Sequence, residues 1–104
     1  MPRLYEPEAR ILALQIAASF PNHIATTTEI KERVPRYHNL THEDHVPSKT
    51  RHNEELWQQV VGNIVSHQES SRSIFNMGYA ERTRDGIRVL EKGLSMLRKR
   101  GLYE

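Results

Sequence analysis

The chain has 104 residues, 37% of them hydrophobic, which suffices for one small domain with a lean core. It contains no cysteine, which excludes disulfides, zinc–thiolate sites and thiol nucleophiles. The formal net charge is only +2, and no apolar run is long enough to cross a bilayer or resembles a secretion signal. We therefore expect one domain over residues 1–104, located in the cytoplasm and without a membrane partner.

The N-terminal part of the chain predicts a leader, a helix and a strand. Residues 1–6 form the leader. Pro7 can occupy the first turn of a core helix, which should stop at Phe20 because Pro21 disfavours helical geometry in the residue before it. Residues 24–26 predict a very short strand.

A second short helix and an insertion follow. Thr27 or Thr28 can cap a helix over residues 29–34, which Pro35 should end. Residues 37–49 predict an insertion before the next helix. Within it, Thr41-His42-Glu43-Asp44 has the form of a capping box, which predicts a short helical turn at about residues 41–45.

Arg51–Ser70 predicts the central helix of the domain. Its apolar residues recur at intervals of three and four, the spacing of one helical face. Asn53 can cap its start, with Glu54 and Glu55 in the first turn, where the helix dipole favours acids. The apolar face comprises Leu56, Trp57, Val60, Val61, Ile64 and Val65.

The opposite face of this helix carries short polar side chains in place of the usual Glu and Lys. It comprises Gln58, Gln59, Gly62, Asn63, Ser66 and His67. Because Gln and Asn can pair with adenine in the major groove, this face predicts a recognition helix. The alternative is a buried or partner-facing helix whose polar side is merely solvated. Gly62 costs about 1 kcal/mol relative to Ala within a helix, so either another backbone or DNA should approach it closely.

The C-terminal part predicts a hairpin and a final helix. Ile74, Phe75 and Met77 should return to the core. The predicted strands cover residues 79–83 and 87–90, with Asp85-Gly86 as a favoured hairpin connection, and the last helix covers residues 91–100 with Gly101 as its C-cap. From Arg72 to Glu104 there are eight lysines and arginines against four acids, a pattern expected for phosphate contact but also common for solubility alone.

The order helix, helix, insertion, helix, hairpin, helix is the layout of a winged helix. We therefore predict an α+β, mostly helical fold: a winged helix-turn-helix with a two-stranded C-terminal wing and a final helix. In this arrangement the third helix enters the major groove, and the hairpin lies beside it over the DNA backbone or minor groove.

The central helix, Phe75-Asn76-Met77-Gly78-Tyr79-Ala80 and the segment from Asp85 to Gly93 together resemble the N-terminal winged-helix domain of Mrr-type restriction endonucleases and related restriction-system modules. Trp57 and Asn63 match that pattern, as does Leu90-Glu91-Lys92-Gly93, except that Leu90 stands where the family usually has Thr. The resemblance covers roughly residues 28–97. It implies a DNA-recognition module whose nuclease domain is not part of this chain.

The sequence supports a catalytic site or a metal site less well than it supports a DNA-binding surface. His42-Glu43-Asp44-His45 groups two imidazoles and two carboxylates, with His38 and His52 nearby, but the spacing is not that of a zinc protease, so an exposed polar loop is favoured. The sequence shows no cluster of acids of the kind that metal-assisted nucleases use. We expect no enzyme activity, no metal and no cofactor.

The favoured function is sequence- or modification-dependent binding of double-stranded DNA. The alternative is a winged helix that mediates dimerisation or protein–protein contacts as a regulator, and a reader of modified bases is a third variant. A homodimer or a separate nuclease or effector chain is the expected protein partner. The predicted base contacts are Gln58, Gln59, Asn63, Ser66 and His67, and the predicted backbone contacts are Lys49, Arg51, Arg72, Arg82, Arg84 and Arg88.

Overall fold

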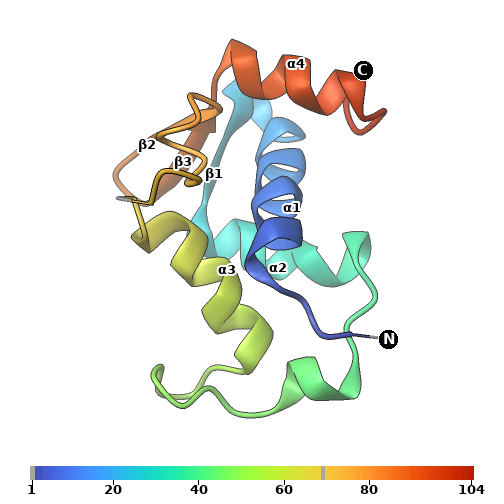
Figure 1. The fold of residues 1–104 in the computed structure, drawn as a ribbon, viewed down its shortest axis with the longest axis vertical. Helices are drawn as coiled ribbons and strands as arrows, with labels where there is room; N and C mark the ends of the chain where they lie inside the picture. The colour runs from blue at the N-terminus through green and yellow to red at the C-terminus, as the bar shows by residue number, and fades with distance from the viewer. Residues whose placement is uncertain (1, 69) are drawn as a thin grey trace.

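Helix α1 (Glu6–Ala18) lies at the centre of the domain, and the other helices and the sheet contact it (Figure 1). The computed structural model describes residues 2–68 and 70–104, so Met1 of the predicted leader and Glu69 of the central stretch lie outside the described residues. In this part of the chain four α-helices and a three-stranded antiparallel sheet form a compact α+β domain that is about half helical. The remaining elements are η1 (Pro21–His23), β1 (Ile24–Thr26), α2 (Thr27–Tyr37), η2 (His42–His45), α3 (Leu56–Ser66), β2 (Ala80–Arg82), β3 (Gly86–Val89) and α4 (Glu91–Lys99).

The first helix is a core helix, as the sequence predicts. Leu14 and Ile16 are fully buried, and the buried alanines at positions 13, 17 and 18 let neighbouring elements approach closely. The helix ends at Ala18, two residues before the predicted end, because the Ser19 hydroxyl donates to the Ile16 carbonyl at 2.6 Å and closes the last turn. None of the helices in the described residues has the length and apolar character needed to cross a bilayer.

The predicted leader is not a free extension, since Leu4 is fully buried. Its backbone N–H donates to Asp44 Oδ1 at 2.7 Å. Asp44 Oδ2 in turn accepts from the backbone N–H of Thr41 at 2.8 Å, which confirms the capping box and the short helical turn inside the insertion. Burial raises the pKa of Asp44, but the hydrogen bonds from Thr41 and Leu4 outweigh it, and the pKa lies below its ordinary value.

Two expectations for the second helix are wrong. Thr26, rather than Thr27 or Thr28, is the N-cap: its Oγ1 accepts from the Glu29 N–H at 3.0 Å, and Glu29 Oε1 accepts from the Thr26 N–H at 2.9 Å. Pro35 does not end α2, which continues to Tyr37. The proline is tolerated because it lies in the last turn, where only one helical hydrogen bond is lost.

The predicted short strand β1 is present, and it pairs with the returning strand of the hairpin. The sheet order is β1-β3-β2, with Ala25 and Arg82 both opposite Ile87. A Cβ on Gly86 would stand 2.0 Å from the Ala25 carbonyl oxygen, so glycine is required here by the close approach of β1. Ile87 in the central strand is fully buried, and α1 packs against this strand.

The hairpin connection differs from the prediction. The Thr83 N–H donates to the Gly86 carbonyl at 3.0 Å, so the two central turn residues are Arg84 and Asp85 rather than Asp85 and Gly86. Asp85 accepts at its backbone oxygen from the Thr27 N–H at 2.9 Å, which holds the turn against the start of α2. The hairpin is therefore short and docked on the helical part of the domain.

The connection after α3 and the last helix largely follow the prediction. Ile74 is buried and Phe75 packs against the core, but the prediction for Met77 is wrong because this side chain is 38% exposed. The C-cap at Gly101 is confirmed: its φ is +72°, and the following Leu102 N–H donates back to Leu97 at 2.9 Å.

Candidate nucleic-acid interface

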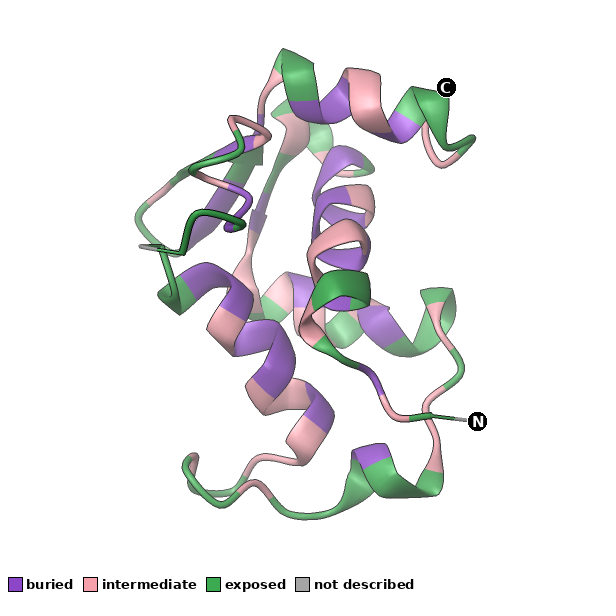
Figure 2. Ribbon diagram, in the orientation of Figure 1, coloured by how far each residue is buried: buried purple, intermediate pink, exposed green. Residues whose placement is uncertain are grey.

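Helix α3 turns its apolar face inward, as predicted. Trp57, Val61 and Ile64 are buried against α1 and α2, whereas the polar side chains on the other side are exposed or half-buried (Figure 2). The helix is shorter than predicted because it begins at Leu56 and ends at Ser66. Its outward face is nevertheless the one on which the sequence places the polar side chains.

Residues 46–55, called the lobe below, fold into a non-helical segment before α3, where the sequence predicts the first turns of a longer helix. The Leu56 N–H donates to the Val46 carbonyl and the Ser48 N–H to the Glu54 carbonyl, both at 2.8 Å, so residues 46–48 and 54–56 run side by side. Asn53 lies between them in the left-handed region with φ +60°, and it is not the N-cap. The lobe is the exposed segment that precedes α3 in Figure 2.

Glu55 is the residue that caps α3. Gln58 Oε1 accepts from the Glu55 N–H at 2.8 Å, and the Glu55 carboxylate caps the helix in return. The same carboxylate bonds to His45 Nδ1 and accepts from Trp57 Nε1, both at 2.9 Å. The hydrogen bond with His45, followed by that from Trp57, lowers the pKa of Glu55, so the cap is ionised at neutral pH.

Arg51 folds back from the lobe onto the outward face of α3. Its Nη2 donates to Asn63 Oδ1 at 3.3 Å and to Ser66 Oγ at 3.4 Å. A Cβ added to Gly62 would stand 3.0 Å from the Arg51 guanidinium carbon. Gly62 is therefore explained by this guanidinium, and neither of the two expected causes, an approaching backbone or DNA, is needed.

Ser48 and Glu54 hold Arg51 in this position. The Ser48 hydroxyl accepts from the Arg51 N–H at 3.0 Å and donates to Gln59 Oε1 at 2.6 Å, which ties the lobe to α3. Glu54 Oε1 lies 3.9 Å from Arg51 Nε, and its other oxygen pairs with Lys31 Nζ at 2.6 Å. The guanidinium is thus oriented before any ligand arrives.

The amide side chains on the outward face of α3 already make hydrogen bonds within the protein, which the sequence alone does not show. The side-chain oxygens of Gln58, Gln59 and Asn63 accept from Glu55, Ser48 and Arg51, respectively. Adenine recognition needs such an oxygen to accept from the base N6 while the amide nitrogen donates to N7. With the oxygens engaged inside the protein, the face presents mainly hydrogen-bond donors.

The three predicted wing arginines have different environments. Arg82 Nη1 donates to the Val65 carbonyl at 3.0 Å and so links β2 to the last turn of α3. Arg88 Nε donates to Glu81 Oε1 at 2.8 Å across the strand pair. Arg84 is exposed at the hairpin turn and makes no ion pair with the described residues.

The remaining predicted site residues are more widely placed. Lys49 is exposed on the lobe before α3, and exposed His67 lies with its Nδ1 3.8 Å from the Glu6 carboxylate. Arg72 lies away from the outward face of α3 and lines a groove beside α1. Sequence reasoning did not identify Ser48 as the residue that orients Arg51. The glycine at position 62 indicated a close approach but not which side chain makes it.

The histidines and acids of the insertion do not converge on a common point. Across residues 2–68 and 70–104, no three His, Asp or Glu side chains come together in a geometry that would hold a metal ion. Asp44 is instead used to bind backbone amides, and His45 pairs with the capping Glu55.

Comparison with known proteins adds no assignment, since no family model, no curated protein and no solved structure matches this chain.

Proposed function

We propose that the chain is a winged-helix protein that binds double-stranded DNA through the outward face of α3 and is not itself an enzyme. The element order α1-β1-α2-α3-β2-β3-α4 and the sheet order β1-β3-β2 support the winged-helix assignment, because a hairpin follows the third helix and its returning strand pairs with β1. The hydrogen bond from Arg82 to Val65 ties these two elements together.

The observation that carries the proposal is the position of Arg51. This guanidinium lies against α3, directly over the glycine of the helix. Its contacts with Asn63 and Ser66 use part of the guanidinium and leave other N–H groups of its planar fork for a ligand. Arginine bound bidentately to guanine O6 and N7 is the commonest specific contact in the major groove.

The flanking cations support a backbone-binding role around this centre. Lys49 on the lobe and Arg84 at the hairpin turn are exposed and make no ion pair with the described residues. Each can neutralise one phosphate, which gives binding its dependence on salt. Arg88 is a weaker candidate because its guanidinium is already paired with Glu81.

The proposed role as the recognition module of a restriction-type system, acting with a separate nuclease chain, depends on the resemblance of residues 28–97. Under this proposal the recognised site is a DNA sequence or a modified base that offers acceptors to a donor-rich helix face. The engaged amide oxygens favour guanine over adenine at the position that α3 contacts.

The test is a fluorescence anisotropy titration of a labelled duplex of random sequence at several salt concentrations. Arg84→Ala should reduce the magnitude of the slope of log K against log salt by about 1, because one phosphate contact is lost. Lys99→Ala is the matched control, since Lys99 is an exposed cation on α4 at the other end of the molecule (Figure 1). Absence of duplex binding, or equal effects of the two substitutions, would contradict the proposal.

A further inference from the structure

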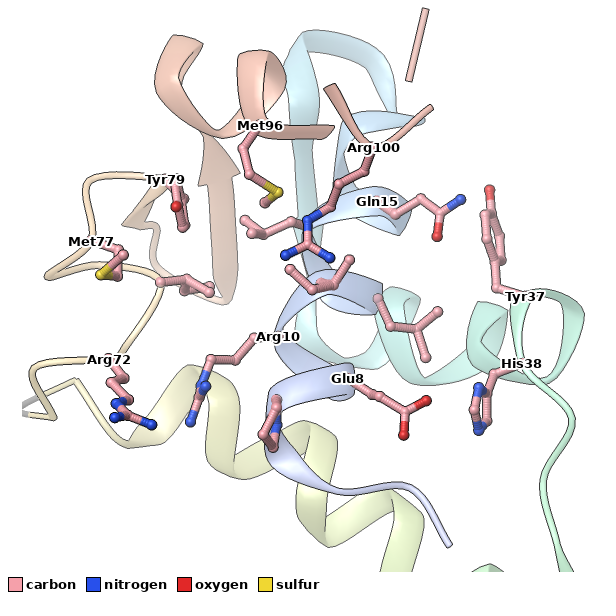
Figure 3. Close-up of a pocket in the computed structure, with 15 residues that line it drawn as sticks. Glu8, Arg10, Gln15, Tyr37, His38, Arg72, Met77, Tyr79, Met96 and Arg100 are labelled. Carbon is pink, nitrogen blue, oxygen red and sulfur yellow. The ribbon is translucent and has the colours of Figure 1, made fainter. Parts of the chain in front are cut away.

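A second surface of the molecule has the character of a binding site. An open groove of about 770 Å³ lies between α1 and α4 and is closed at its sides by the end of α2 and by the connection after α3 (Figure 3). No residue of α3 lines it, so it is separate from the proposed DNA-binding face.

The floor of the groove is apolar and adaptable. Ile11 of α1, Met77 of the connection and Met96 of α4 line it, and Met77 is among the large hydrophobic side chains that the fold leaves exposed. Methionine side chains are flexible and polarisable, which suits them to pack against varied apolar partners. The floor therefore offers an adaptable apolar contact surface.

The charged residues that line the groove are predominantly cationic. Arg10, Arg72 and Arg100 come from three different segments, and Figure 3 shows them around the same opening. Within residues 2–68 and 70–104, none of these three guanidinium groups has a carboxylate within 4.0 Å, so their charges are available to a ligand. Glu8 is the one acid that lines the groove.

We propose that this groove binds an acidic amphipathic segment of a partner protein, independently of the proposed DNA binding. Aliphatic side chains on one side of the segment fill the floor between Ile11 and Met96, and its carboxylates pair with the three arginines. A helix whose apolar residues recur at i, i+3 or i+4 and i+7 satisfies both requirements.

The composition of the groove favours this occupant over nucleic acid or a small molecule. A phosphodiester backbone would pair with the arginines but brings no aliphatic group to cover Met77 and Met96. Small-molecule sites usually bury most of the ligand in a cleft, whereas this groove is open along its length. A continuous peptide segment can use both the floor and the charged rim.

The experiment is a selection from a displayed library of random helical peptides, followed by anisotropy titrations of the enriched peptides with the full chain. The expected peptides carry Asp or Glu beside spaced Leu, Ile or Phe. Arg100→Glu and Arg72→Glu should each weaken their binding about tenfold or more, and Met96→Ser should weaken it as well. Lys99→Glu is the matched control, since Lys99 is next to Arg100 in the chain but does not line the groove; it should change affinity less than threefold.

Urea unfolding of each variant shows that the fold is intact before binding is compared. Enrichment of neutral or basic peptides, failure to enrich any peptide, or equal losses from Arg100→Glu and Lys99→Glu would overturn the proposal. So would concentration-dependent dimerisation of the chain that Arg100→Glu abolishes, because the groove would then be an interface between two copies. Duplex binding measured on the same variants should be unchanged by Arg100→Glu, which separates failure here from failure of the DNA-binding proposal.

Discussion

The guanidinium carbon of Arg51 lies 3.0 Å from the point where a Cβ on Gly62 would stand. Arg51 of the lobe before α3 thus packs against Gly62, the one glycine of that helix. It accounts for a glycine that is unfavourable in a helix interior, and it places a positive charge on the outward face of α3. The first prediction follows from it.

Gly62→Ala should separate stability from DNA binding. Alanine favours the helix by up to about 1 kcal/mol, so the free energy of unfolding in urea should stay the same or rise slightly. The new methyl group would stand 3.0 Å from the Arg51 guanidinium carbon, so the guanidinium must shift and its contacts with Asn63 and Ser66 should weaken. Affinity for duplex DNA should therefore fall, by less than in Arg51→Ala. In the Arg51→Ala background, Gly62→Ala should have no further effect on affinity. Additive losses in the double variant would show that Gly62 acts in another way.

Asp44→Asn should destabilise the domain in a pH-dependent manner. The pKa of Asp44 is lowered in the folded chain, so its carboxylate stabilises the fold fully above its unfolded pKa near 3.9. That stabilisation is lost as the pH falls through the folded pKa. At pH 7 the substitution should cost about 1–3 kcal/mol, since the amide group of Asn cannot accept from both Thr41 and Leu4.

The measurement for Asp44 is urea unfolding from pH 7 down to pH 2. The stability difference between the wild type and Asp44→Asn should shrink below about pH 4. Glu43→Gln, at the exposed neighbouring position, should show little difference at any pH. A difference for Asp44→Asn that stays constant across this range would mean that its ionisation contributes nothing.

Gly86→Ala should be strongly destabilising, although a simple turn glycine would tolerate it better. Its Cβ would stand 2.0 Å from the Ala25 carbonyl oxygen, and backbone cannot move away without breaking the β1–β3 pairing. We expect a loss of about 3 kcal/mol. Gly101→Ala is the comparison, because φ is +72° there but nothing lies within 4 Å, and it should cost about 1–2 kcal/mol. Equal urea midpoints for the two variants would contradict this.

Arg84→Ala and Arg88→Ala should differ in their effect on the salt dependence of duplex binding. Arg84 is exposed without an ion pair among the described residues, whereas Arg88 is held by Glu81. Arg84→Ala should therefore reduce the magnitude of the slope of log K against log salt by about 1, and Arg88→Ala should reduce it by clearly less. Titrations at four salt concentrations measure both slopes, and a larger change for Arg88→Ala would remove Arg84 from the proposed interface.

Local patterns predicted the helices and the short strands, because periodicity and capping residues act within a few positions of the chain. Thus the buried face of α3, the Thr41–Asp44 cap and the Gly101 terminus follow directly from their neighbours. Long-range contacts were not predictable in this way. The pairing of β1 with β3, which makes Gly86 necessary, joins residues 60 to 64 positions apart in the chain.

The candidate site was predictable in its location but not in its geometry. The polar face of α3 follows from the helical period. The use of the three amide oxygens by Glu55, Ser48 and Arg51 depends on how the lobe folds back. Asn53 illustrates the difficulty, since asparagine suits both an N-cap and a left-handed turn, and the pairing of Val46 with Leu56 decides between them.

The most direct test of the account is selection of bound duplexes from a random and base-modified library, carried out with the wild type and with Arg51→Ala in parallel. The account predicts that the wild type enriches a site containing a guanine or a modified base, and that Arg51→Ala loses the preference at that one position while Lys99→Ala keeps it. Enrichment of the same site by Arg51→Ala, or no enrichment by the wild type, would contradict the assignment of α3 as a DNA-recognition helix.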